Sequence, residues 1–150
     1  YVKRKYNLVI GQKTAQSMKE TLGSGIPGNT QTMVVVGRDV VSGLPIEMEM
    51  SGAVVYEAIK DNLNTICNSI KMILEKTPPE LARDIIHSGI YITGGSSQIH
   101  VLDQLFRDIT GIEINTCEEP EECVVRGLLK IVSDAKFKHL AFSMKNKILL

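Results

Sequence analysis

The sequence lacks a net charge, a long apolar run and a matched set of cysteines, and each absence argues against a class of protein. Its 150 residues hold 17 Lys and Arg and 17 Asp and Glu, so no overall field draws the chain to nucleic acid. No apolar run approaches the roughly 18 residues that cross a bilayer. Cys67, Cys117 and Cys123 are odd in number and lack metal-ligand spacing, which favours reduced thiols in a cytosolic protein.

Other candidate metal ligands are also sparse. His87 and His100 have no partners at the spacing of a metal site. Acidic residues cluster at the start of an expected helix, where carboxylates favour the positive end of the helix dipole and face solvent. These are Glu118, Glu119, Glu121 and Glu122. We therefore predict no metal site.

The length of the chain fits one hydrophobic core, or one core with a small lobe. The first residue is Tyr1 rather than an initiator methionine, so we expect a fragment of a longer protein. The family resemblance described below implies that residues 1–50 form a small lobe with a helix and a β-hairpin, and that residues 51–135 form the later part of a large lobe. Residues 136–150 form a basic tail that docks on its own domain or frays, with contact to a membrane surface as the alternative.

The small lobe carries one helical and two strand-like patterns. Helix formers fill residues 14–22 and stop at Gly23, which predicts a helix there. The runs 32–36 and 45–50 predict a hairpin around an irregular connection. The first run is apolar on both faces, whereas Glu47 and Glu49 alternate with apolar residues in the second, which predicts one solvated face.

A long amphipathic helix is the clearest pattern in the large lobe. Ser51 is its expected N-cap, and Pro78 and Pro79 end it near Thr77. Pro79 also suits the first position of a short helix over residues 80–87. Apolar residues recur along the long helix at steps of three and four: Val55, Ile59, Leu63, Ile66, Ile70 and Ile73.

The next segment alternates between strand and helix. A strand at residues 90–92, a helix at 98–110 and a strand at 112–116 form a βαβ unit, which predicts two parallel neighbouring strands. A further helix follows at 120–133. Gly94 and Gly95 join the first strand to the helix, and Ser96 and Ser97 follow them. A strand, a glycine turn and a helix N-terminus can hold an anion or a nucleotide, although a tight turn alone is the simpler alternative.

Several stretches together carry a family resemblance: residues 6–19, 36–39, 43–45, 77–82, 93–96 and 119–127. In their order and spacing they resemble the actin-like ATPases, and within them the MreB family of bacterial rod-shape-determining proteins. The likeness runs from residue 1 to about residue 133. It implies an α/β fold, as part of an actin-like (ribonuclease H-like) ATPase domain, with a βαβ unit, flanking helices and a small α+β lobe.

The resemblance also implies a nucleotide site. ATP would be the cofactor, with the catalytic phosphate loops and the Mg²⁺ ligands in earlier sequence that is missing here, so no residue is assigned a catalytic role and the fragment should not hydrolyse ATP alone. One set of contacts would come from the family's adenosine-side glycine loop, here Gly94, Gly95, Ser96 and Ser97. The other would come from the stretch Gln16, Ser17, Met18 and Lys19.

This chain departs from the family pattern at both places. Gln16 stands where the family has a glutamate that contacts ribose hydroxyls. The amide oxygen of Gln16 can accept hydrogen bonds from these hydroxyls, but without the assistance of a negative charge. Lys19 would border the base on the same helix face. Ser96 and Ser97 stand where the family has a further glycine and an alanine, so their side chains narrow the approach. We therefore expect weaker nucleotide binding.

By resemblance, the parent protein polymerises with itself into membrane-associated filaments on the inner face of the cytoplasmic membrane, where it guides cell-wall synthesis. Its partners would be the cell-wall elongation machinery and the inner membrane surface, with no nucleic acid. An ATP-dependent small-molecule kinase or chaperone of the same fold, or a non-catalytic paralogue that acts as an interaction module, are the alternatives. Because strands of the large lobe would lie outside this sequence, we expect an exposed sheet edge beside Ile90, and self-association or rearranged packing.

Overall fold

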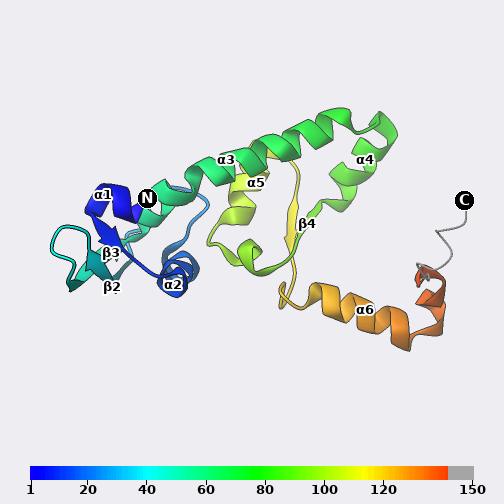
Figure 1. The fold of residues 1–150 in the computed structure, drawn as a ribbon. Coiled ribbons are helices and arrows are strands. Elements are labelled where there is room, and N and C mark those ends of the chain that lie inside the picture. Colours follow the sequence, from blue (N-terminus) through cyan, green and yellow to red (C-terminus); the bar gives the residue numbers. More distant parts are fainter. Residues whose placement is uncertain (142–150) are drawn as a thin grey trace, which may run out of the picture.

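The computed structural model describes residues 1–141, and its helix α3 (Gly52–Lys76) connects two regions along an elongated molecule (Figure 1). The part of the tail from residue 142 onward lies outside the described residues. Before α3 come α1 (Val2–Tyr6), β1 (Leu8–Val9), α2 (Gln12–Leu22), β2 (Thr32–Asp39) and β3 (Pro45–Ser51). After it come α4 (Pro79–Ser88), β4 (Ile90–Ile92), the 3-10 helix η1 (Gly95–Gln98), α5 (Leu102–Thr110), β5 (Ile114–Thr116), α6 (Cys123–Ser133) and the 3-10 helix η2 (Ala135–Leu140).

The first region is built on a three-stranded antiparallel sheet in the order β1-β2-β3. The predicted hairpin is confirmed, with Val35 paired to Met48 in its register. Glu47 and Glu49 are exposed along β3, so that strand has the solvated face expected from its alternation. Strand β1 was missed by the sequence analysis, because two residues are too short for a periodic pattern.

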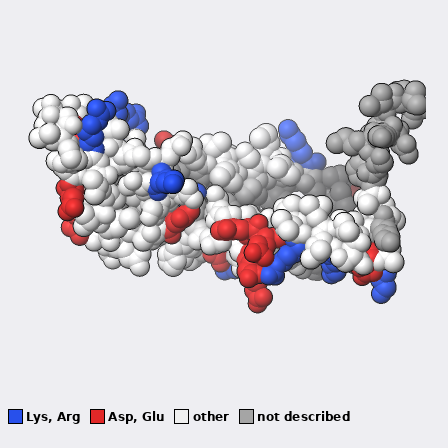
Figure 2. Space-filling model, turned by 60° about the horizontal axis from the view of Figure 1, so that its bottom comes forward, with Lys and Arg blue, Asp and Glu red and all other residues white. Residues whose placement is uncertain are grey.

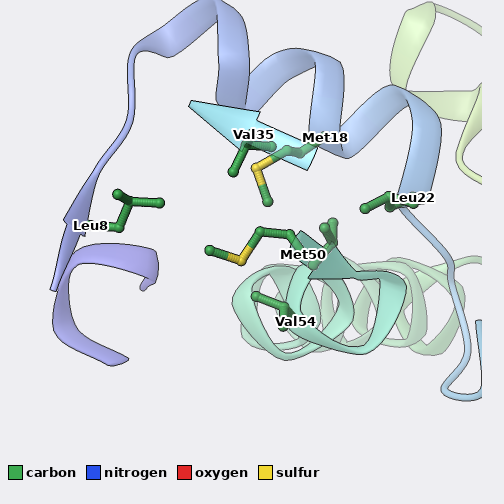
Figure 3. Close-up of a cluster of buried hydrophobic side chains, with 7 residues drawn as sticks. Leu8, Met18, Leu22, Val35, Met50 and Val54 are labelled. Atoms are coloured by element: carbon green, nitrogen blue, oxygen red, sulfur yellow. The ribbon is translucent and has the colours of Figure 1, made fainter. Parts of the chain in front are cut away.

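A cluster of buried side chains lies between α2, the sheet and the first turn of α3 (Figure 3). Met18 and Leu22 are four residues apart on α2, so both point to the same side of that helix. They meet side chains from all three strands and from α3, and the cluster consists of Leu8, Met18, Leu22, Val35, Met50, Val54 and Val55. This packing fixes the position of α2 on the sheet.

A second cluster lies against the middle of α3 and contains Leu63, Cys67, Leu102, Phe106 and Ile114. The long helix and its end before Thr77 are confirmed. Ser51 is the N-cap residue, as predicted. Ile66 and Ile73 are 47% and 65% exposed, because only part of the apolar stripe finds a partner. The side chain of Ser51 makes no capping hydrogen bond.

The two clusters consist largely of residues from different parts of the chain. They do not test the lobe boundaries at residues 50 and 135, which stay a prediction. Within residues 1–141, no group of three or more His, Cys, Asp or Glu could hold a metal ion. None of the helices in the same residues is long and apolar enough to span a bilayer.

The βαβ segment is confirmed, with β4 and β5 as parallel neighbours. The helix between them begins at Leu102 rather than Gln98. Val101 takes a left-handed conformation at φ 50°, which cannot be part of an α-helix. The periodicity of apolar residues does not reveal a single residue in a left-handed conformation. The last helix begins at Cys123 rather than Pro120.

Because α6 starts later than predicted, the glutamates at 118–122 precede it instead of forming its first turn. Acidic side chains gather over this segment in Figure 2. Arg126 pairs with Glu119 and with Glu122. Helix α6 extends away from β4 (Figure 1), and several of its apolar side chains are exposed: Val124, Val125, Leu128, Leu129 and Val132.

The buried cysteine gives a first testable prediction. Cys67 is 4% exposed, and burial raises the pKa of its thiol, whereas Cys117 is partly exposed. Because the thiolate is the reactive form, iodoacetamide at mildly alkaline pH should alkylate Cys67 at least about tenfold more slowly than Cys117. Mass spectrometry of timed samples measures both rates. In concentrated urea the two rates should converge, and equal rates in the native protein would contradict this packing.

Candidate functional site

Two parts of the chain that are far apart in sequence line one groove of about 660 Å³. Helix α2 provides one wall, and the turn after β4 provides the other. A single residue from the segment before α6 closes the groove. The lining residues are Gln16, Lys19, Glu20, Gly94, Gly95, Ser96, Gln98, Ile99 and Glu121.

The walls are held together by a close backbone contact between the end of α2 and the start of α5. The N–H of Gly25 donates to the carbonyl of His100 at 2.8 Å, and Ser24 forms a parallel β-bridge with His100. A Cβ at position 25 would lie 2.9 Å from the Val101 carbonyl oxygen and 2.9 Å from Leu102 Cα. Only glycine therefore allows this approach, which places α2 opposite the glycine turn.

The glycine turn is itself fixed to the segment before α6. Gly94 has φ 87°, a conformation that favours glycine, and its N–H donates to the Pro120 carbonyl at 2.7 Å. The Ser97 hydroxyl donates to the Gly94 carbonyl at 2.7 Å. The 3-10 helix η1 follows directly, so the expected N-terminus of a long helix is absent from this turn. The sequence prediction of a helix dipole aimed at an anion here is wrong.

The polar side chains of the groove form two amide–carboxylate pairs. Gln16 Nε2 donates to Glu20 Oε1 at 2.7 Å along α2, and Gln98 Nε2 donates to Glu121 Oε1 at 3.1 Å across the turn. Lys19 is partly buried, and no ion pair within residues 1–141 includes it. The groove thus offers two carboxylates, two amides and one ammonium group, which suits a ligand rich in hydroxyl and amino groups.

The structure brings together most of the predicted site residues. Gln16, Lys19, Gly94, Gly95 and Ser96 line the groove. The remaining three do not line it. Met18 is 3% exposed within the first cluster, Ser17 faces solvent on α2, and the Ser97 hydroxyl is bonded within the turn.

Sequence reasoning missed two acidic lining residues. Glu20 lies four residues after Gln16, so the helical period could have placed it on the same face. Glu121 comes from a segment more than 20 residues after the turn, and no local pattern connects it with Gln98. Only the folded chain shows that contact.

Comparisons with known proteins point to one family. A family model described as MreB/Mbl protein matches residues 1–139. The cell shape-determining protein Mbl of Bacillus cereus is 38% identical over 128 residues, which are 85% of this chain and 38% of that protein. The cell shape-determining protein MreB of Escherichia coli is 37% identical over 128 residues, which are 85% of this chain and 37% of that protein.

A solved structure of a protein with the same family name is also similar to this chain. The crystal structure of MreB 5 of Spiroplasma citri bound to AMPPNP is 35% identical and has a TM-score of 0.84. The match covers 93% of this chain and 42% of that one. The chain therefore spans less than half the length of these relatives.

Proposed function

The chain belongs to the MreB/Mbl family and has the α/β fold of the actin-like ATPases, and from this we propose that it is the ATP-binding C-terminal part of a bacterial cytoskeletal protein. The parent protein polymerises into membrane-associated filaments and controls cell shape by guiding cell-wall synthesis. The names of the relatives from Bacillus cereus and Escherichia coli support the role in cell shape. The AMPPNP bound to the Spiroplasma citri protein supports the nucleotide.

The observation that carries the proposal is the groove between α2 and the glycine turn. The two stretches that resemble the family's nucleotide contacts lie on its opposite walls. Carboxylates and an amide carbonyl accept hydrogen bonds from ribose hydroxyls and base amino groups, so these residues fit the nucleoside part of ATP. Within residues 1–141 the acidic side chains form no cluster for Mg²⁺, and we assign no step to that ion.

Nucleotide binding is tested with a fluorescent ATP analogue titrated against the 150-residue chain. Lys19→Ala removes the one ammonium group of the groove lining and should weaken binding about fivefold. Lys13→Ala is the matched control, because Lys13 is exposed on the same helix and does not line the groove. Equal affinities of the two variants would contradict the site. ATP-dependent pelleting of the chain or its parent would support the filament.

The exposed apolar face of α6 favours a second candidate, a nucleotide-independent interaction module. Val124, Leu129 and Val132 are 69%, 63% and 73% exposed, and such a face is typical of a surface that packs against another protein. Pelleting that is equal with and without ATP, together with no nucleotide binding, would favour this candidate over the first.

A further inference from the structure

Two cysteines border the short segment that connects β5 to α6. Cys117 directly follows the last residue of β5, and Cys123 is the first residue of α6. Both thiols are partly exposed, whereas Cys67 is buried. Because an oxidant must reach the sulfur that it oxidises, Cys117 and Cys123 are the cysteines of this chain that are open to redox chemistry.

The segment between these cysteines folds back on itself and brings the two thiols together. The Glu122 N–H donates to the Glu119 carbonyl at 2.9 Å, which closes a tight turn. The Cys123 thiol donates to the same carbonyl, with Sγ 3.8 Å from the oxygen. The Cys117 side chain lies within hydrogen-bonding reach of the Cys123 thiol, and partial burial, together with this neighbour, raises the pKa of Cys123. Two thiols in such contact can be joined by a disulfide.

The same segment holds the glycine turn in place. The Pro120 carbonyl accepts from the Gly94 N–H at 2.7 Å, and Glu121 Oε1 accepts from Gln98 Nε2 at 3.1 Å. Both acceptors lie between the two cysteines in the sequence. A covalent bond between the cysteines would close a short loop around both acceptors and reduce the number of conformations that the segment can take.

We propose that Cys117 and Cys123 are a redox modification site, at which a peroxide oxidises the two thiols to a disulfide that restrains the segment holding the glycine turn. Cys117 reacts first, because the Cys123 thiol keeps its proton in the hydrogen bond to Glu119. A peroxide carries no charge, so the glutamates of the segment do not repel it.

The oxidation takes two steps. The Cys117 thiolate attacks one oxygen of hydrogen peroxide, the O–O bond breaks, hydroxide leaves, and Cys117 becomes a sulfenic acid. The Cys123 sulfur then attacks the Cys117 sulfur, the S–S bond forms, and the S–O bond breaks with loss of a second hydroxide. The two thiol protons convert both hydroxides to water, so the two sulfurs are oxidised and the peroxide is reduced. A thiol reductant restores both cysteines by disulfide exchange.

The test treats the reduced 150-residue chain with a small excess of hydrogen peroxide, labels the remaining thiols with iodoacetamide in urea, and measures tryptic peptides by mass spectrometry. Trypsin cleaves after Arg107 and Arg126, so both cysteines lie in one peptide. This peptide should be unlabelled and lighter by two hydrogens, whereas Cys67 in the same sample should carry the label. Dithiothreitol added before the label should restore labelling of both cysteines.

Two variants separate the roles of the thiols. In Cys123→Ser the reaction should stop at the sulfenic acid of Cys117, which dimedone labels. In Cys117→Ser the remaining thiol keeps its proton, so its labelling by dimedone should be at least about fivefold lower. Equal labelling of the two variants would overturn the order of attack, and disulfides that link separate molecules, or oxidation of Cys67 at the same rate, would overturn the site.

Hydrogen exchange followed by nuclear magnetic resonance tests the effect on the turn. In the oxidised chain the Gly94 amide should exchange at least about threefold more slowly than in the reduced chain, because its acceptor is restrained. The Gly25 amide is the internal control, since it bonds to His100 away from the segment, and its exchange rate should change by less than about twofold. Equal exchange of the Gly94 amide in the two forms would overturn the restraint.

Discussion

Replacing Gly25 by valine should lower the free energy of unfolding by about 3 kcal/mol and weaken nucleotide binding at least about tenfold. A side chain at this position meets the Val101 carbonyl oxygen and Leu102 Cα, each 2.9 Å from the new Cβ. Both are backbone atoms, so no side-chain rotation relieves the clash. The end of α2 must move away from α5, which breaks the hydrogen bond to His100 and widens the groove.

Urea denaturation followed by circular dichroism measures the stability, and titration with the fluorescent ATP analogue measures the binding. Gly127→Val is the matched control, because no atom lies within 4 Å of a Cβ there and valine is no worse than glycine within a helix. Its free energy of unfolding should stay within about 0.5 kcal/mol of the natural value. If both variants lose stability equally, the contact between Gly25 and Leu102 does not hold the two walls together.

Replacing Leu22 by alanine should lower the free energy of unfolding by about 3 kcal/mol. Leu22 is 0% exposed at the last position of α2, so its loss removes buried apolar contacts and leaves a cavity beside the sheet. Leu22 also lies three residues before Gly25, whose hydrogen bond to His100 connects the two walls of the groove. The loss of its packing should therefore let α2, which carries Gln16 and Lys19, move relative to the glycine turn. Nucleotide affinity should therefore fall together with stability.

Leu81→Ala makes the same chemical change in α4, where Leu81 is 55% exposed. It should cost less than about 1 kcal/mol, since little apolar surface is lost and alanine is a good helix former. The comparison uses the midpoint and slope of urea denaturation for both variants. A cost for Leu22→Ala as small as that for Leu81→Ala would show that the first cluster contributes little to stability.

Much of the fold could be predicted because its signals are local. The apolar periodicity of α3 predicted the helix, and the prolines after Thr77 predicted where it ends. The apolar run at β4 and the second strand β5 were predicted as parallel partners, as the structure shows. The start of α5 could not be predicted, because the left-handed conformation of Val101 delays the helix until Leu102.

The candidate site could likewise be predicted only in part from the sequence. Gln16 and Lys19 share one face of α2 because they are three residues apart, and the glycines of the turn are visible in the sequence. That these two stretches face one groove depends on the contact between Gly25 and His100, which joins residues about 75 positions apart. The position of Glu121 depends on its hydrogen bond with Gln98.

The sequence by itself determined the order of the longer elements, the family and five of the residues that line the two walls, because periodicity, turn residues and motif spacing are properties of neighbouring positions. Only the tertiary structure decided which walls meet and what charge they carry where they meet. The reason is physical: the close backbone approach at Gly25 and the placement of the Glu121 carboxylate arise from contacts between distant segments. Such contacts leave no periodic trace in the chain.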